Sequence, residues 1–160
     1  MAGRNYFALS DRTTSVSPES SDPRVIRSIA VTTEDLVSAL EMNRTSNKHA
    51  VLRVTPPFSG RMRARLHIES GDEYDQQPRP IHIEPRTLVD ELPPYPRPAE
   101  TEDELREDSQ QRYTVERHHE YHSEAVDEWR KTVPSTLSEQ TVIETDAGSV
   151  SVELSFLGKR

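Results

Sequence analysis

The spacing of apolar and polar residues divides the chain into short strands, two main helices and polar connections. Apolar residues alternate with arginine or histidine over residues 61–68, which is the two-residue period of a strand with one buried face. A hydroxyl, two acids and apolar residues three and four apart predict a helix over 33–43. Apolar and histidine side chains at the same spacings predict a longer helix over 115–133, which Pro134 ends.

Other β-branched or apolar runs predict the remaining strands, at 50–55, 81–84, 141–145 and 150–156. A five-residue connection ending in Gly60 pairs 50–55 with 61–68 as an antiparallel hairpin, and a second Gly-bearing turn forms a C-terminal β-hairpin. We therefore expect an α+β fold in which one small antiparallel sheet is packed by two main helices.

Composition sets the expected domain boundaries. Residues 1–23 are rich in serine, threonine and proline and predict a flexible tail, because they bury too little apolar surface to offset the entropy of ordering. Seven of the 12 prolines fall within 78–98, which predicts an extended connector inside a single domain over 24–160. The expected core comprises the apolar side chains of the helices and strands: Leu36, Leu40, Leu52, Val54, Leu66, Ile68, Ile81, Ile83, Val126, Trp129, Val152 and Leu154.

The charge is acidic overall and uneven along the chain. The formal net charge is −8, made up of +3 in residues 1–70 and −11 in residues 71–160. Of the 20 basic residues only Lys48, Lys131 and Lys159 are lysine. Arginine is more weakly hydrated than lysine and pairs with carboxylates in a fixed fork, so this bias fits a salt-rich cytoplasm, although a high-GC genome also favours arginine.

The predicted strand 61–68 carries the clearest candidate site. If it pairs with 50–55, one surface opposite the core collects the following basic side chains: Arg53, Arg61, Arg63, Arg65, His67 and, on the neighbouring strand, His82. Such a face can bind an acidic protein, or it can follow a nucleic-acid backbone with nearby aromatic rings stacking on bases. The acidic segment 100–108 could instead cover these arginines within the same molecule.

A second candidate is a histidine pair on the longer helix. His118 and His122 are one helical turn apart, a spacing that can hold a metal ion. A zinc-protease helix needs glutamate directly after the first histidine, and His119 occupies that place. Because His119 and His122 also share the apolar stripe of this helix, the alternative is a pair of histidines at the edge of the core or at an interface.

The sequence lacks the residues or motifs that several kinds of functional site require. Without cysteine, the chain can form no disulfide, thiolate zinc site or iron–sulfur cluster. The five glycines are scattered, which argues against a phosphate-binding loop, and no serine lies in a nucleophile turn. No apolar run is long enough to span a membrane, and the N-terminus lacks a secretory signal. We therefore expect a cytoplasmic protein with no cofactor and no membrane contact.

Three stretches, TTEDLVSALE (32–41), VLRVTPPFSGRMRARLH (51–67) and LPPYP (92–96), resemble a haloarchaeal family of small proteins with no assigned function. The resemblance covers roughly residues 29–133. It implies a salt-adapted cytoplasmic setting and assigns no catalytic or binding residue. From the residues themselves we predict a non-enzymatic protein-binding or adaptor protein that uses the arginine-rich face. Two alternatives stay open: a nucleic-acid-binding protein that uses the same face, and a metal-dependent enzyme with its site on helix 115–133.

Overall fold

The computed structural model describes residues 20–70, 78–108, 110 and 112–158, so most of the expected tail lies outside the described residues. Within them the elements follow in this order: η3 (Pro23–Val25), β2 (Ser28–Thr32), α1 (Thr33–Thr45), β3 (Ala50–Val54), β4 (Arg61–Arg63), β5 (Arg65–Ile68), β6 (Ile81–Ile83), η4 (Pro85–Leu88), α2 (Pro98–Glu107), α3 (Val115–Thr132), η5 (Val133–Thr136), β7 (Gln140–Thr145) and β8 (Gly148–Leu157). The expected α+β class is confirmed, and so is the C-terminal β-hairpin, which β7 and β8 form.

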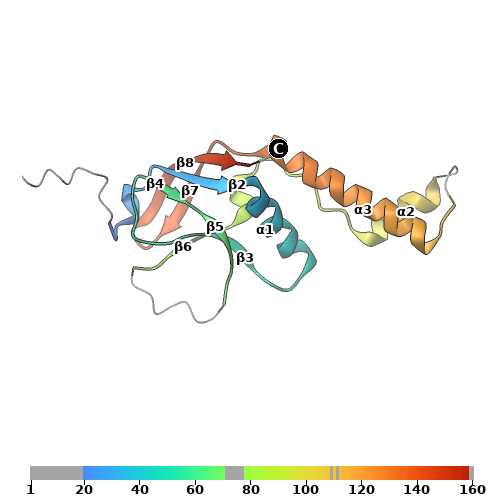
Figure 1. The fold of residues 1–160 in the computed structure, drawn as a ribbon, viewed down its shortest axis with the longest axis horizontal. Coiled ribbons are helices and arrows are strands. Elements are labelled where there is room, and N and C mark those ends of the chain that lie inside the picture. The colour runs from blue at the N-terminus through green and yellow to red at the C-terminus, as the bar shows by residue number, and fades with distance from the viewer. Residues whose placement is uncertain (1–19, 71–77, 109, 111, 159–160) are drawn as a thin grey trace, which may run out of the picture.

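The strands form two sheets (Figure 1). In the first, with the order β4-β2-β8-β7, β2 runs parallel to both of its neighbours and β7 pairs antiparallel with β8. The second, with the order β5-β3-β6, is antiparallel throughout. The structure therefore divides the expected sheet in two, because β2, a strand that the pattern of residues did not predict, organises a mixed sheet of its own.

The division between the sheets falls inside the predicted strand 61–68. Its first part, β4, pairs with β2, and its second part, β5, pairs with β3. Between them Ala64 is fully buried, and its N–H donates to the carbonyl oxygen of Ala30 at 2.9 Å. The prediction of one continuous strand is wrong, because strict alternation fits equally well two short strands that meet at a small buried residue and join different sheets.

The apolar core lies where the two sheets and α1 meet. Thr32 caps α1 by accepting a hydrogen bond from the Asp35 N–H at 3.1 Å, and the helix packs against β3 and β5. Most of the expected core residues are buried, but Leu66 and Leu154 are half-buried and Ile68 is exposed. Leu66 and Ile68 lie on β5, and an edge strand leaves part of its apolar surface uncovered.

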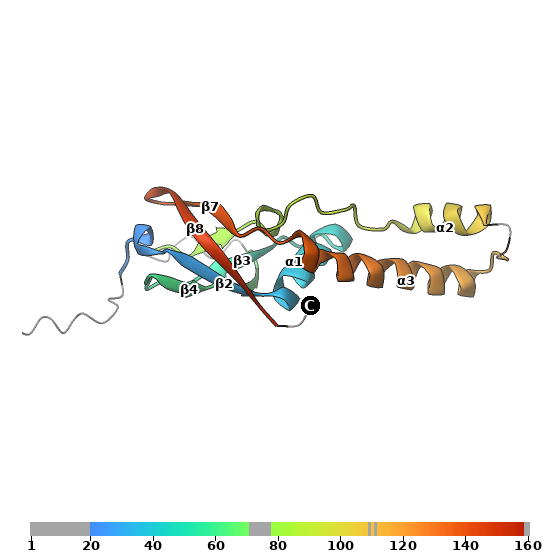
Figure 2. The ribbon, with the colours of Figure 1, turned by 90° about the horizontal axis from the view of Figure 1, so that it is seen from above.

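Helices α2 and α3 form an arm (residues 98–132, the helical arm) that extends away from the strands (Figure 2). Leu105 is 1% exposed and Thr101 is buried in this pair of helices, whereas Trp129, near the other end of α3, belongs to the apolar core of the body, meaning the two sheets and α1. The acidic segment 100–108 lies on α2 and its C-cap Asp108, at the end of the arm that points away from the strands (Figures 1 and 2), so it does not cover the arginines of β3, β4 and β5.

The Pro-rich connector is fixed to the body where the helical arm begins. Trp129 donates its indole N–H to the carbonyl oxygen of Pro93 at 2.9 Å, and its ring meets the Tyr95 ring edge-to-face at 4.9 Å. The Tyr95 hydroxyl donates to Glu41 at 2.8 Å, and burial together with this carboxylate raises the pKa of Tyr95 to about 12. Glu41 also accepts two hydrogen bonds from Arg130. These contacts fix the direction of the helical arm.

At the other end of the body, the described chain begins in contact with the connection between β3 and β4. Ser20 exchanges two backbone hydrogen bonds with Phe58, at 2.7 and 2.6 Å, and Pro23 is buried. None of the described helices has the length and apolar character needed to cross a membrane.

Candidate binding site

The three-stranded sheet brings four of the predicted site residues onto one face. Arg53 on β3 lies directly opposite Arg65 on β5 and His82 on β6. His67 follows Arg65 by two positions and therefore shares its face. The Arg53 guanidinium lies 3.3 Å from the His67 ring nitrogen Nδ1, and the His67 and His82 rings are 5.3 Å apart.

The other two predicted residues lie on the first sheet. Arg61 and Arg63 belong to β4, which is an edge strand, and Arg65 begins the edge strand of the second sheet. All three side chains are exposed, and none forms an ion pair with a carboxylate in the described parts of the chain. We call these three residues the arginine edge. The structure thus separates the predicted face into the arginine edge and the sheet face of Arg53, His67 and His82.

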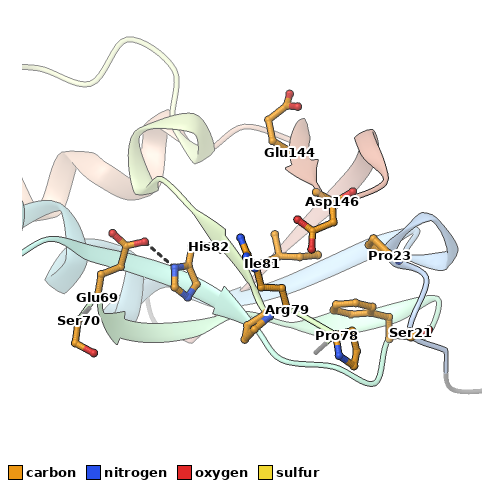
Figure 3. A pocket seen from close by; sticks show the side chains of 13 residues that line it. Ser21, Pro23, Glu69, Ser70, Pro78, Arg79, Ile81, His82, Glu144 and Asp146 are labelled. Carbon is orange, nitrogen blue, oxygen red and sulfur yellow. Dashed lines mark hydrogen bonds and ion pairs between the residues drawn. The ribbon is translucent and has the colours of Figure 1, made fainter. Parts of the chain in front are cut away.

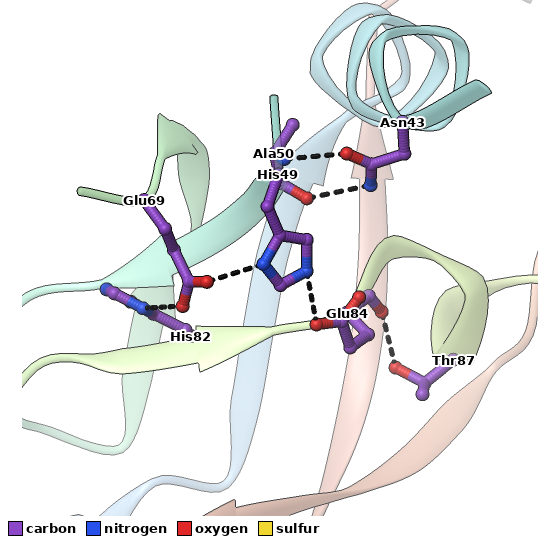
Figure 4. Close-up of polar contacts among 7 residues, drawn as sticks. All are labelled: Asn43, His49, Ala50, Glu69, His82, Glu84 and Thr87. Carbon is purple, nitrogen blue, oxygen red and sulfur yellow. Dashed lines mark hydrogen bonds and ion pairs between the residues drawn. The ribbon is translucent and has the colours of Figure 1, made fainter. Parts of the chain in front are cut away.

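The sheet face also holds a chain of alternating histidines and glutamates, the His–Glu network (His49, Glu69, His82 and Glu84; Figure 4). Glu69 accepts from the Nδ1 atoms of two histidines, at 2.5 Å from His49 and 2.6 Å from His82. Nε2 of His49 lies 2.7 Å from Glu84. The network ties the beginning of β3 to the ends of β5 and β6.

The geometry around His49 favours its charged form. Each of its ring nitrogens faces a carboxylate oxygen, and only the imidazolium can donate a hydrogen bond from both nitrogens. Burial lowers the pKa of His49, but hydrogen bonds and charge from Glu69 and Glu84 outweigh it and raise the pKa above the ordinary 6.5. For Glu69, burial raises the pKa, but hydrogen bonds from His82 and His49 bring it below the ordinary 4.5.

Sequence reasoning did not assign His49, Glu69 or Glu84 to a site, although a signal for them exists. His49 precedes Arg53 by four positions, while Glu69 and Glu84 follow His67 and His82 by two. The same two-residue period therefore places all of them on the polar face, just beyond the ends of the strands. The predicted strand boundaries excluded His49.

A cavity of about 380 Å³ lies beside the His–Glu network (Figure 3). Its lining combines acidic and basic side chains with the ring of Phe58; the charged ones are Glu69, Arg79, His82, Glu144 and Asp146. Acids and bases are nearly balanced there, so the cavity favours neither an anion nor a cation.

The histidines and glutamates of the His–Glu network form hydrogen bonds with one another. Both ring nitrogens of His49 contact carboxylates, and Nδ1 of His82 is held by Glu69. Nε2 of His82 is enclosed by protein, which keeps it away from any molecule in the cavity. A general base needs a nitrogen that reaches its substrate. The network therefore supports a structural role better than proton transfer.

A comparison with known protein families identifies the family of this chain. Residues 16–158 match the family described as Domain of unknown function (DUF8009). The chain belongs to this family. No curated protein and no solved structure matches the chain. The function of this DUF8009 domain must accordingly be argued from its own surfaces.

The histidine pair of the DUF8009 domain holds its helical arm together. Thr101 on α2 lies with its hydroxyl 2.9 Å from His118 Nε2 and 3.0 Å from His122 Nδ1. Nε2 of His118 also lies 3.1 Å from the Pro98 carbonyl oxygen, to which it can donate. In the described part of the chain, no group of three or more histidine or acidic side chains is arranged to hold a metal ion. Of the two histidines that the alternative placed at the edge of the core or at an interface, His122 packs against α2, whereas His119 is exposed.

Proposed function

We propose that this DUF8009 domain is a non-enzymatic protein-binding or adaptor protein, and that its arginine edge docks an acidic surface of a partner protein. The observation that carries the proposal is the exposure of Arg61, Arg63 and Arg65 without an ion-paired carboxylate in the described residues, in a chain with 28 acids and 20 bases. The chain has more carboxylates than basic groups, yet among the residues that the structure describes no carboxylate forms an ion pair with these three guanidiniums.

The arrangement of the arginine edge suits a flat partner surface. The three residues fall within five positions and on consecutive strands at the margins of both sheets. Guanidinium groups bind carboxylates through two parallel hydrogen bonds, which adds direction to the attraction between charges. The three site residues of the sheet face, Arg53, His67 and His82, would lie at the border of this contact, because Arg53 is directly opposite Arg65.

The proposal includes a salt-adapted cytoplasm as the setting. At molar salt the screening length is about 3 Å, so only close, hydrogen-bonded contacts keep their strength. Arginine forks meet that condition better than the ammonium group of lysine. The scarcity of lysine in the chain supports the same setting.

An edge strand also uses charge for a simpler purpose, because charged side chains discourage unwanted pairing between sheets of two molecules. That purpose needs charge alone, whereas the proposed docking needs the guanidinium fork. Replacement of the three arginines by lysine therefore separates the two roles.

The experiment compares three forms of the full chain as baits at molar salt in an extract of the native cell: wild type, R61S/R63S/R65S and R61K/R63K/R65K. We expect the wild type to recover a specific acidic protein and the serine variant to lose it. The lysine variant should bind the identified partner about tenfold or more weakly in a direct titration.

The matched control is R44S/K48S/R86S, which removes the same charge from exposed positions elsewhere on the body. It should recover the partner as the wild type does. Unchanged recovery by R61S/R63S/R65S would contradict the proposal. Loss of the partner after nuclease treatment would also contradict it and would favour nucleic acid as the molecule that contacts this edge.

A further inference from the structure

A second cavity, of about 590 Å³, lies between the end of α1, the loop that leads into β3, η4, the Pro-rich connector and α3. We call it the connector cleft. Its volume falls within the range of small-molecule sites. It is separate from the arginine edge, since none of Arg61, Arg63 and Arg65 lines it.

One wall of the connector cleft is apolar. It comprises Leu40, Val89, Leu92, Pro93, Pro94, Tyr95 and Trp129. The polar tips of the two aromatic residues are already bonded, because the Trp129 indole N–H donates to Pro93 and the Tyr95 hydroxyl donates to Glu41. This wall therefore presents aromatic and aliphatic surface to a ligand, and no free hydrogen-bonding group from Trp129 or Tyr95.

The rim of the connector cleft is cationic. Arg44, Lys48 and Arg86 line it from three different elements, all three are exposed, and none forms an ion pair in the described residues. Of the two acids in the lining, Glu84 lies 2.7 Å from Nε2 of His49, which leaves Glu91 as the acid without such a partner among the described residues. The rim thus carries more positive than negative charge.

The loop that carries Lys48 is held in place before any ligand arrives. The Asn43 side chain accepts from the Ala50 N–H at 2.6 Å and donates to the Ala50 carbonyl at 2.9 Å (Figure 4). The Ser46 hydroxyl accepts from the Lys48 N–H at 3.2 Å and donates to the Met42 carbonyl at 2.9 Å. A loop fixed at both ends loses little conformational entropy on binding.

We propose that the connector cleft binds a small organic anion: a carboxylate, sulfonate or phosphate group on an aromatic or aliphatic body. The body lies against the wall of Tyr95, Trp129 and the prolines, and the anionic group lies at the rim between Arg44, Lys48 and Arg86. Apolar walls with a few converging charged groups are the usual composition of such sites. This site goes beyond the docking of a partner protein and does not depend on it.

The test uses two dyes that share one ring system, anilinonaphthalene sulfonate and its uncharged parent N-phenylnaphthylamine. Trp129 is the sole tryptophan, so its emission and its indole N–H signal in a proton–nitrogen NMR spectrum both report on the cleft. We expect one sulfonate dye to bind per chain, to quench Trp129 and to shift the indole signal. The uncharged dye should bind about tenfold or more weakly.

Two variants of equal charge change locate the effect. R44Q/K48Q/R86Q should weaken the sulfonate dye about tenfold and leave the uncharged dye unchanged. R61Q/R63Q/R65Q should bind both dyes as the wild type does. Because all six positions are exposed, both variants are expected to fold, and circular dichroism melting verifies this.

Three results would overturn the proposal: equal affinity for the two dyes, unchanged sulfonate binding by the cleft variant, or an indole signal that does not move at saturation. None of them bears on the partner experiment. Conversely, unchanged partner recovery by R61S/R63S/R65S would contradict the arginine edge proposal and would leave the connector cleft proposal unaffected.

Discussion

The helical arm and the body differ in how their basic side chains are paired with carboxylates. All four basic residues on α2 and α3 lie against carboxylates: Arg106 on Glu102, Arg117 on Glu120, Arg130 on Glu41 and Asp127, and Lys131 on Glu128. On the body, the arginine edge and the rim of the connector cleft carry exposed cations that form no ion pair among the described residues.

This difference follows from helix and sheet geometry. On a helix, residues three and four positions apart are neighbours, so a helix rich in acids finds partners for its few bases within one turn. Along the arginine edge the residue two positions away is again arginine, and the residues opposite on the paired strands, Ser28, Ala30 and Arg53, include no acid. Exposed ion pairs contribute little to stability, but they neutralise the charge that a binding surface needs.

The largest expected effect comes from breaking the contact that joins the two regions. Trp129 is 4% exposed and packs on Tyr95 at the base of the helical arm. Trp129→Ala should lower the free energy of unfolding by about 3–5 kcal/mol, because it leaves a large cavity. Urea unfolding followed by far-UV circular dichroism measures this, since the variant has no tryptophan.

Val142→Ala is the control for this measurement. Val142 is 52% exposed on β7, and its truncation should change the free energy of unfolding by no more than about 0.5 kcal/mol. A loss below about 1 kcal/mol in Trp129→Ala would show that the helical arm is not held by this contact.

A smaller effect, confined to one region, tests whether the helical arm is a separate unit. Leu105→Ala removes the most buried apolar side chain of α2, for which about 2–4 kcal/mol of local stability is expected. Hydrogen exchange should show faster exchange in α2 with unchanged protection in β3 and β8. Val115→Ala, at an exposed position of α3, is the matched control. Equal loss of protection in the body would contradict the separation.

The smallest expected effect is a pH dependence of opposite sign in the two regions. The pKa of His49 is raised, so its contribution is full below pH 6.5 and is lost as pH rises through the raised value. The pKa of His122 is lowered, by burial and then by the charges of His118 and His119. Its neutral form is favoured in the fold, and stability falls as pH drops below 6.5.

Melting temperatures of His49→Gln and His122→Gln across the range near neutrality separate these contributions. The deficit of His49→Gln relative to wild type should be larger at about pH 5.5 than at about pH 7.5, and the deficit of His122→Gln should be smaller. Parallel curves for the two variants would contradict the opposite signs. Below pH 4.5 the contribution of Glu69 is also lost, because its pKa is lowered in the fold.

Much of the fold follows from local patterns in the sequence. The caps and spacings of α1 and α3 and the Gly-bearing turn of the last hairpin lie in adjacent residues, so the sequence predicts these elements well. The two-sheet arrangement depends on β2, whose partners β4 and β8 are distant in sequence. Local periodicity carries no information about such pairing, which is why the switch at Ala64 was not predicted.

The candidate site was predictable to a similar extent. The period of the strands placed Arg53, Arg65, His67 and His82 together correctly. It could not separate Arg61 and Arg63 from them, because that requires knowledge of which sheet each residue joins. The connector cleft had no local signal, since its wall and rim come from five segments that only the tertiary structure brings together.

The place of β8 has a consequence for synthesis. Ile29 on β2 pairs with Leu154 on β8, so β2 cannot form this pairing until β8, which lies far along the chain, has been synthesised. Until then β2 presents unsatisfied backbone groups to its surroundings, which invites misassembly in a crowded cell. The larger sheet is therefore completed only after β8 has been synthesised, and the interval before β8 emerges is when a nascent chain of this kind would benefit most from a chaperone.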